Sequence, residues 1–207
     1  MSASATDRKG PATYADLEAV PEHLVAEIID GVLVTRRHGR PAVAMARSTL
    51  MQALAPLRQS RCNPNADWQL LHLPELHLGG AVVVPECAGW LTARLPFLPD
   101  DHVSLAPDWV CELAAEDETV NPALDAKLSL YRLLGVDHVW IVEVDRRRLR
   151  VLRAEPSGWR HITTVGAPDI VRAPPFDAIS FSLADLWPLD PPLGMNEDPT
   201  PYYAGDR

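Results

Sequence analysis

Lysine and cysteine are both scarce in this chain of 207 residues. Of its 19 Lys and Arg side chains, only Lys9 and Lys127 are lysine. The three cysteines, Cys62, Cys87 and Cys111, are odd in number and lack Cys-x-x-Cys spacing. This pattern argues against a disulfide framework and a structural zinc site, so we interpret all three as reduced, mostly buried thiols.

A long apolar run is also missing, so the sequence offers no membrane span. The N-terminal segment carries Arg8 and Lys9, but the residues that follow do not form the apolar core of a secretory signal. We therefore expect a cytoplasmic protein of average apolar content, with room for one sizeable core.

An excess of positive charge is absent as well, since the formal net charge is −9. This argues against a protein that coats nucleic acid non-specifically, because such binding depends on Lys and Arg neutralising phosphates. It does not exclude a nuclease, whose metal-dependent active site is itself acidic. Two arginine runs, Arg36–Arg40 and Arg146–Arg150, are candidates for local phosphate contacts, although the second is more typical of a solvated hairpin turn.

Hydrophobic periodicity and turn residues predict one domain over residues 12–188. A leader at residues 1–11 and a Pro-rich tail at residues 189–207 are expected to be disordered. The expected helices are Tyr14–Leu17, Glu22–Asp30, Pro41–Leu57, Ala123–Leu134 and Leu183–Leu186. The expected strands are Val32–Thr35, Gln69–His77, Ala81–Ala88, Asp108–Ala114, His138–Val144, Leu149–Ala154 and Trp159–Val165, with a hairpin turn at Gly79–Gly80.

Lys127 falls on the apolar stripe of its expected helix. The stripe consists, at helical spacing, of Leu124, Leu128, Tyr131 and Leu134. The ammonium group of Lys127 therefore points towards the core, where a charge is tolerated only if it is paired or reaches out to solvent. Two interpretations stay open: carboxylates converge on Lys127 for chemistry, or a buried salt bridge merely fixes the helix.

Two glutamates occur singly inside apolar strands. In the obvious register of the two strands, Glu86 and Glu112 lie side by side, while Cys87 and Cys111 face the other way. Two carboxylates that close repel each other unless a divalent cation lies between them, and Mg²⁺ is typically held by one or two carboxylates together with substrate phosphate. Alternatively, Glu86 is a charged residue that protects a sheet edge after Pro85.

An ordered series of motifs extends this pattern along the chain. It comprises Tyr14–Glu18, Glu27–Gly31, the two strand glutamates, Lys127 with Tyr131, Gly135–Val142, Pro175–Phe176 and Leu183–Trp187. The series resembles the Uma-two family of restriction endonucleases, within the PD-(D/E)-x-K nuclease superfamily, with the lysine displaced from strand to helix. The resemblance implies an α+β fold with a restriction-endonuclease-like core, in which helices flank a mixed central β-sheet.

The resemblance also implies a role for each site residue. Glu86 stands where the family has the Asp of its Pro-Asp motif, and Glu112 matches the strand glutamate, so both are expected to bind Mg²⁺ (or Mn²⁺). The carbonyl of Leu113 is expected to help. Lys127 matches the lysine that orients or activates the attacking water and offsets the charge that develops on phosphate, and Glu27 matches a helix glutamate that assists the metal site. A glutamate at a helix border is, however, ordinarily solvated. The implied reaction is metal-assisted phosphodiester hydrolysis.

Departures from the family pattern leave two hypotheses. Glu86 adds a methylene to the usual Asp, the segment Ala115–Glu118 replaces Ser-Pro, and Ala123 replaces an Asp one turn before the lysine. The first hypothesis is a Mg²⁺-dependent DNA endonuclease, expected to be a homodimer because two symmetric sites cut both strands of a duplex most easily. The second is a catalytically degenerate protein that acts as a binding or interaction module. The site chemistry does not distinguish DNA from RNA.

Overall fold

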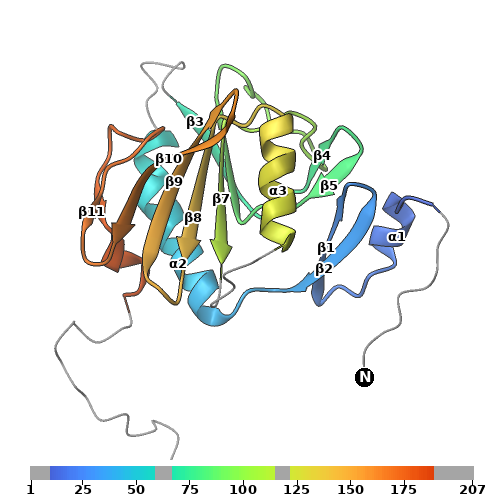
Figure 1. The fold of residues 1–207 in the computed structure, drawn as a ribbon, viewed down its shortest axis with the longest axis horizontal. Helices are drawn as coiled ribbons and strands as arrows, with labels where there is room; N and C mark the ends of the chain where they lie inside the picture. The colour runs from blue at the N-terminus through green and yellow to red at the C-terminus, as the bar shows by residue number, and fades with distance from the viewer. Residues whose placement is uncertain (1–9, 59–66, 115–121, 189–207) are drawn as a thin grey trace, which may run out of the picture.

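The computed structural model describes residues 10–58, 67–114 and 122–188 (Figure 1). A six-stranded sheet lies at its centre, with the strand order β10-β9-β8-β7-β6-β3. Its strands are β3 (Trp68–His72), β6 (Cys87–Leu91), β7 (Trp109–Ala114), β8 (His138–Glu143), β9 (Arg148–Glu155) and β10 (Gly158–Gly166). The sheet is mixed because β7 and β8 are parallel and the other pairs are antiparallel. Helix α3 (Pro122–Leu133) lies in the crossover that such a parallel pair requires.

Helices cover both faces of this sheet (Figure 1). Alternation along β7 sets the two faces: Cys111 packs in one core cluster with Leu50 of α2 (Pro41–Leu54), and Val110 packs in the other with Tyr131 of α3. The α+β fold with a mixed sheet flanked by helices is thus confirmed. None of the helices in the described part of the chain combines the length and apolar character needed to cross a lipid bilayer.

A second, antiparallel sheet has the order β2-β1-β5-β4. Its strands are β1 (Leu24–Ile29), β2 (Val32–Arg37), β4 (Leu76–Leu78) and β5 (Ala81–Val83). Between β1 and β2, Asp30 and Gly31 both have positive φ, 52° and 74°, as a type I′ hairpin turn requires. The smaller elements are α1 (Tyr14–Glu18), β11 (Ile170–Val171), β12 (Phe181–Ser182) and the 3₁₀ helices Ala55–Arg58 and Leu183–Leu186.

The helix predicted for Glu22–Asp30 is wrong, because strand β1 occupies this segment. Its β-branched residues Ile28 and Ile29 are buried, and the whole strand pairs with β2. The apolar residues of the segment fit a helical stripe and a buried strand equally well, and tertiary pairing decides between them. Glu27 therefore lies on a strand and not at the border of a helix.

The two long strands predicted on either side of Gly79–Gly80 are also wrong in extent. The hairpin turn is present, but each predicted strand is divided between the two sheets, β3 and β4 before the turn, β5 and β6 after it. Glu86 therefore lies in the connection between β5 and β6. The predicted register nevertheless holds for the cysteines, since Cys87 is paired with Cys111.

An aromatic cluster forms the core on the α2 side of the sheet. Phe176 packs edge-on against Trp68, Trp109 and Trp140, with ring centroids 4.9 to 5.4 Å apart. All four side chains are buried. This packing fixes the strands β3, β7 and β8 from one side, while the opposite face remains available for the charged residues described next.

Candidate active site

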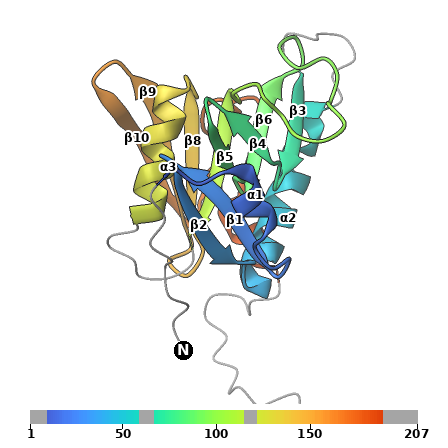
Figure 2. The same ribbon diagram turned by 90° about the vertical axis from the view of Figure 1, so that its right-hand side faces the viewer.

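Four buried charged side chains surround one pocket of about 160 Å³. Glu27 comes from β1, Glu86 from the β5–β6 connection, Glu112 from β7 and Lys127 from α3. These side chains are only 3 to 9 % exposed. Figure 2 shows the β1–β2 hairpin beside α3, in front of the six-stranded sheet, so the pocket lies where both sheets and the helix meet.

Lys127 lies in the pocket, as the helical spacing predicted, and it is paired. Its Nζ is 2.8 Å from Oε1 of Glu112, 3.0 Å from Oε1 of Glu27 and 3.3 Å from the carbonyl oxygen of Val84. Burial lowers the pKa of Lys127, but the attraction of Glu112 and Glu27 outweighs burial, so the pKa lies above its ordinary value. Lys127 is therefore an ammonium ion at neutral pH, able to donate hydrogen bonds but not to accept a proton.

Glu112 is held by two donors on α3. Its Oε1 accepts a hydrogen bond of 2.6 Å from the hydroxyl of Tyr131 and contacts Lys127. Burial raises the pKa of Glu112 above its ordinary value, against the lowering effect of Lys127. Burial and the adjacent Glu112 also raise the pKa of Tyr131 well above its ordinary value, so the phenol remains a donor. One helix therefore orients the carboxylate from two positions a single turn apart.

Glu27 is buried and fully engaged, which excludes the solvated position considered for it. Its Oε1 accepts a hydrogen bond of 2.7 Å from the backbone N–H of Val84 and contacts Lys127. Its Oε2 lies 3.7 Å from Nε of Arg36. Glu27 thus connects β1 to the segment that precedes Glu86 and to the ammonium group of α3.

Glu86 is neither an exposed edge residue nor a partner of Lys127. Its Oε1 lies 2.9 Å from Nη1 of Arg36, and its Oε2 lies 2.6 Å from Nη1 of Arg47. One step beyond the pair Cys87–Cys111, the register of β6 and β7 sets Glu86 next to Glu112, and both line the pocket. The pocket therefore contains both acids that the sequence predicted, Glu112 on a strand and Glu86 in a connection, and two arginines pair with Glu86.

Comparison with known protein families identifies the family of this chain. The model of the Uma2 family, described as "Putative restriction endonuclease", matches residues 11–184. The chain belongs to the Uma2 family. A solved structure from Anabaena variabilis, described as a "putative nuclease belonging to DUF820", shares the fold with a TM-score of 0.67 at 16% identity. The match covers 86% of this chain and 98% of that chain. No curated protein matches this chain significantly.

The Uma2 assignment confirms the family and fold predicted from the ordered motifs, and it supports a nuclease-like function at the coarse level. Restriction-endonuclease-like proteins generally use a divalent cation. Within the described residues, no three His, Cys, Asp or Glu side chains are arranged to hold a metal ion. Mg²⁺ needs fewer, because one or two carboxylates commonly bind it together with phosphate and water.

The carboxylate oxygens in the pocket fit a divalent cation if one of the two arginines releases Glu86. Both contacts that the carboxylate of Glu112 makes with the described residues use Oε1, so its Oε2 has no partner in that part of the chain. Glu86 has no such spare oxygen, because Arg36 and Arg47 engage both. A cation shared by Glu112 and Glu86 therefore fits this Uma2 site once one arginine leaves Glu86.

The sequence did not predict two contacts of the candidate site, namely the ion pair of Arg47 with Glu86 and the hydrogen bond from the Tyr131 hydroxyl to Glu112. Arg47 directly follows Ala46, which is one of the buried residues of α2. Helical spacing in the sequence could therefore have placed Arg47 next to the core. Its contact with Glu86 could not be predicted in this way, because 39 residues separate the two and no periodic pattern connects them. For Arg36, the sequence predicted a candidate phosphate contact but not the ion pairs with Glu27 and Glu86.

Proposed function

We propose that this protein is a divalent-cation-dependent endonuclease that hydrolyses phosphodiester bonds in DNA. The observation that carries the proposal is the convergence of Glu86, Glu112 and Lys127 on one pocket, from three segments of the chain. Membership of the Uma2 family and the shared fold support the same reaction class.

Each residue has a distinct part in the proposed reaction. Glu86 and Glu112, helped by the carbonyl of Leu113, another residue that lines the pocket, would hold Mg²⁺ or Mn²⁺. When bound, the cation supplies Lewis-acid polarisation of the phosphate and lowers the pKa of the attacking water. Lys127 donates hydrogen bonds that orient this water and offsets the charge that develops on phosphate. Glu27 holds the ammonium group of Lys127 in place.

Nicking of supercoiled plasmid tests the proposal. We expect nicking with Mg²⁺ or Mn²⁺ but not with EDTA, and we expect Lys127→Ala and Glu112→Ala each to reduce it by at least about 100-fold, as loss of one electrostatic contact in an active site commonly does. The other lysine supplies a matched control: Lys9→Ala, outside the family match, should nick like the wild type. Circular dichroism would show that each variant is folded. Nicking that survives both active-site changes would point to a contaminating nuclease.

The second candidate is a catalytically degenerate Uma2 protein that acts as a binding or interaction module. The engagement of Glu86 by two arginines favours it, because both carboxylate oxygens of Glu86 already contact a guanidinium group. If the wild type does not nick plasmid, Glu86→Asp becomes the informative variant. Cleavage restored by this change would locate the defect at Glu86, whereas inactivity without any divalent-ion binding would support the degenerate module.

We further propose a homodimer on duplex DNA, working in the cytoplasm. Two sites related by symmetry would allow both strands of a duplex to be cut. The described cysteines, Cys87 and Cys111, are free thiols although their strands are paired, which suits a reducing compartment. Analytical ultracentrifugation measures the oligomeric state directly.

A further inference from the structure

The charges around the pocket balance without any bound ion. Three carboxylates, from Glu27, Glu86 and Glu112, contact three cationic side chains, from Lys127, Arg36 and Arg47. The formal charges of these six groups sum to zero. A divalent cation added to a neutral, largely buried cluster raises its charge to +2, which is unfavourable unless negative charge arrives with it.

The two arginines on Glu86 differ in their freedom to leave it. The side chain of Arg47 comes from α2 and is 18% exposed, and it does not line the pocket. The side chain of Arg36 is 30% exposed, lines the pocket and comes from β2, which is an edge strand of its sheet. Arg36 is therefore the arginine with solvent on one side and the pocket on the other.

The contacts of Arg36 suit a group that changes partners. Besides Glu86, its guanidinium donates a hydrogen bond of 3.2 Å from Nη2 to the carbonyl oxygen of Val84 and lies near Glu27. A guanidinium binds a carboxylate and a phosphate with the same planar geometry, so a phosphodiester can replace Glu86 as its acceptor. Arg36 can then remain at the pocket wall while the carboxylate of Glu86 becomes free.

We infer that Arg36 competes with a divalent cation for Glu86 and becomes a phosphate contact of the site when DNA binds. This inference rests on the proposed function and adds to it a second phosphate-binding group beside Lys127. Its consequence is a linkage: DNA phosphate draws Arg36 away from Glu86 and thereby strengthens cation binding, and the cation strengthens DNA binding by the same factor.

Mn²⁺ affinity, measured by electron paramagnetic resonance with and without a short DNA duplex, tests the inference. The pocket site is defined as the one lost in Glu112→Gln, and the duplex alone serves as a blank. In the wild type we expect the duplex to tighten Mn²⁺ binding by about fivefold or more, the lower end of coupling between sites. In Arg36→Gln we expect tighter Mn²⁺ binding without DNA, by a similar factor, and a smaller effect of the duplex.

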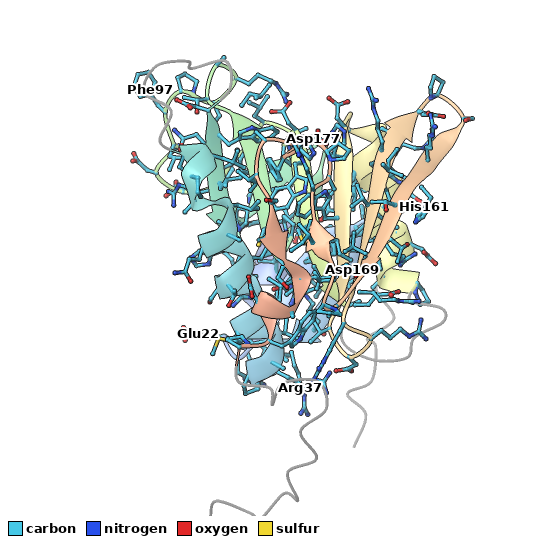
Figure 3. The ribbon with its side chains drawn as sticks, turned by 90° about the vertical axis from the view of Figure 1, so that its left-hand side faces the viewer. Glu22, Arg37, Phe97, His161, Asp169 and Asp177 are labelled. Atoms are coloured by element: carbon cyan, nitrogen blue, oxygen red, sulfur yellow. The ribbon has the colours of Figure 1, made fainter. Side chains whose placement is uncertain are left out.

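The neighbouring Arg37 supplies a matched control. It is exposed and extends away from the fold at the lower edge of the molecule (Figure 3), so Arg37→Gln removes one positive charge from the same strand but not from the pocket. We expect this variant to bind Mn²⁺ like the wild type. Equal tightening in both variants would mean that general electrostatics, and not a contact of Arg36 with Glu86, sets the affinity.

Other outcomes separate the inference from the proposed function. Unchanged or weaker Mn²⁺ binding in Arg36→Gln, with intact binding in the wild type, would overturn the inference and leave the nuclease proposal standing. If Arg36→Gln does not fold, the wild type still decides, because an Mn²⁺ affinity that is the same with and without DNA contradicts the linkage. A wild type that binds no Mn²⁺ in either condition would overturn both.

Discussion

Lys127 has its ammonium group within 3.3 Å of three oxygen atoms and is only 4% exposed. This environment explains why an arginine-rich chain keeps a lysine here. A compact ammonium group fits between two carboxylates and a carbonyl, whereas a planar guanidinium needs more space and a different donor geometry. The same environment keeps Lys127 charged, which limits its part in a reaction to orienting groups and stabilising negative charge.

The raised pKa values of Lys127 and Tyr131 predict a loss of stability at alkaline pH. Both groups hold their protons in the folded protein after the unfolded chain has released them, near its ordinary values of 10.5 and 10.0. Their contribution is therefore complete below about pH 9 and is lost as pH rises through and beyond these values. We expect urea unfolding to give a free energy that falls from about pH 9.5 to about pH 11, with a limiting slope of about 1.4 kcal/mol per pH unit for each group.

Tyr131→Phe isolates one of the two groups. It removes the phenol while keeping the ring, so the decline in unfolding free energy over the same pH range should be shallower than in the wild type. If the unfolding free energies of the variant and the wild type fall in parallel with pH, titration of Tyr131 does not contribute to the decline.

At the scale of elements, the site depends on strands β6 and β7 lying close together. Gly89 of β6 is paired with Trp109 of β7, and a methyl group at this glycine would come within 2.8 Å of Leu70 and 3.2 Å of two tryptophan rings. The side chains of Leu70, Trp68 and Trp109 thus fill the space above Gly89, and a larger residue there would have to displace them. The same pairing, continued by three residues, sets Glu86 next to Glu112.

Gly89→Ala is therefore expected to destabilise the protein by about 1 to 3 kcal/mol, as overpacking of a core commonly does. Gly166 in β10 is the control, because a methyl group there meets no atom within 4 Å. Its replacement by alanine should change stability by less than about 0.5 kcal/mol. Chemical denaturation measures both, and a Gly89→Ala variant as stable as Gly166→Ala would show that the side chains around Gly89 move aside without cost.

Local patterns predicted the elements whose signals are local. Pro41 at the start of α2, the glycine pair between β4 and β5, and the apolar stripe that buries Lys127 all appear where expected. The segment Leu24–Ile29 was misassigned because its apolar residues also fit a helix, and only pairing with β2 and β5 makes it a strand. The arginines on Glu86 depend on contacts between distant segments, which no spacing in the sequence encodes.

For the molecule as a whole, the pocket requires that two sheets come together. The four-stranded sheet supplies Glu27 and Arg36, the six-stranded sheet supplies Glu112, and the connection between the sheets carries Glu86. Lys127 contacts acids from both sheets, so the ammonium group of one helix links the two layers electrostatically. The charge-balanced cluster therefore contributes to assembly of the fold as well as to the proposed chemistry.

The location of Mn²⁺ in crystals grown with a short DNA duplex tests the central claim most directly. Anomalous diffraction is expected to show Mn²⁺ in the pocket, bonded to carboxylate oxygens of Glu112 and Glu86, with Arg36 moved from Glu86 to a phosphate. An ion bound elsewhere, with Glu86 still held by both arginines beside the DNA, would contradict the account.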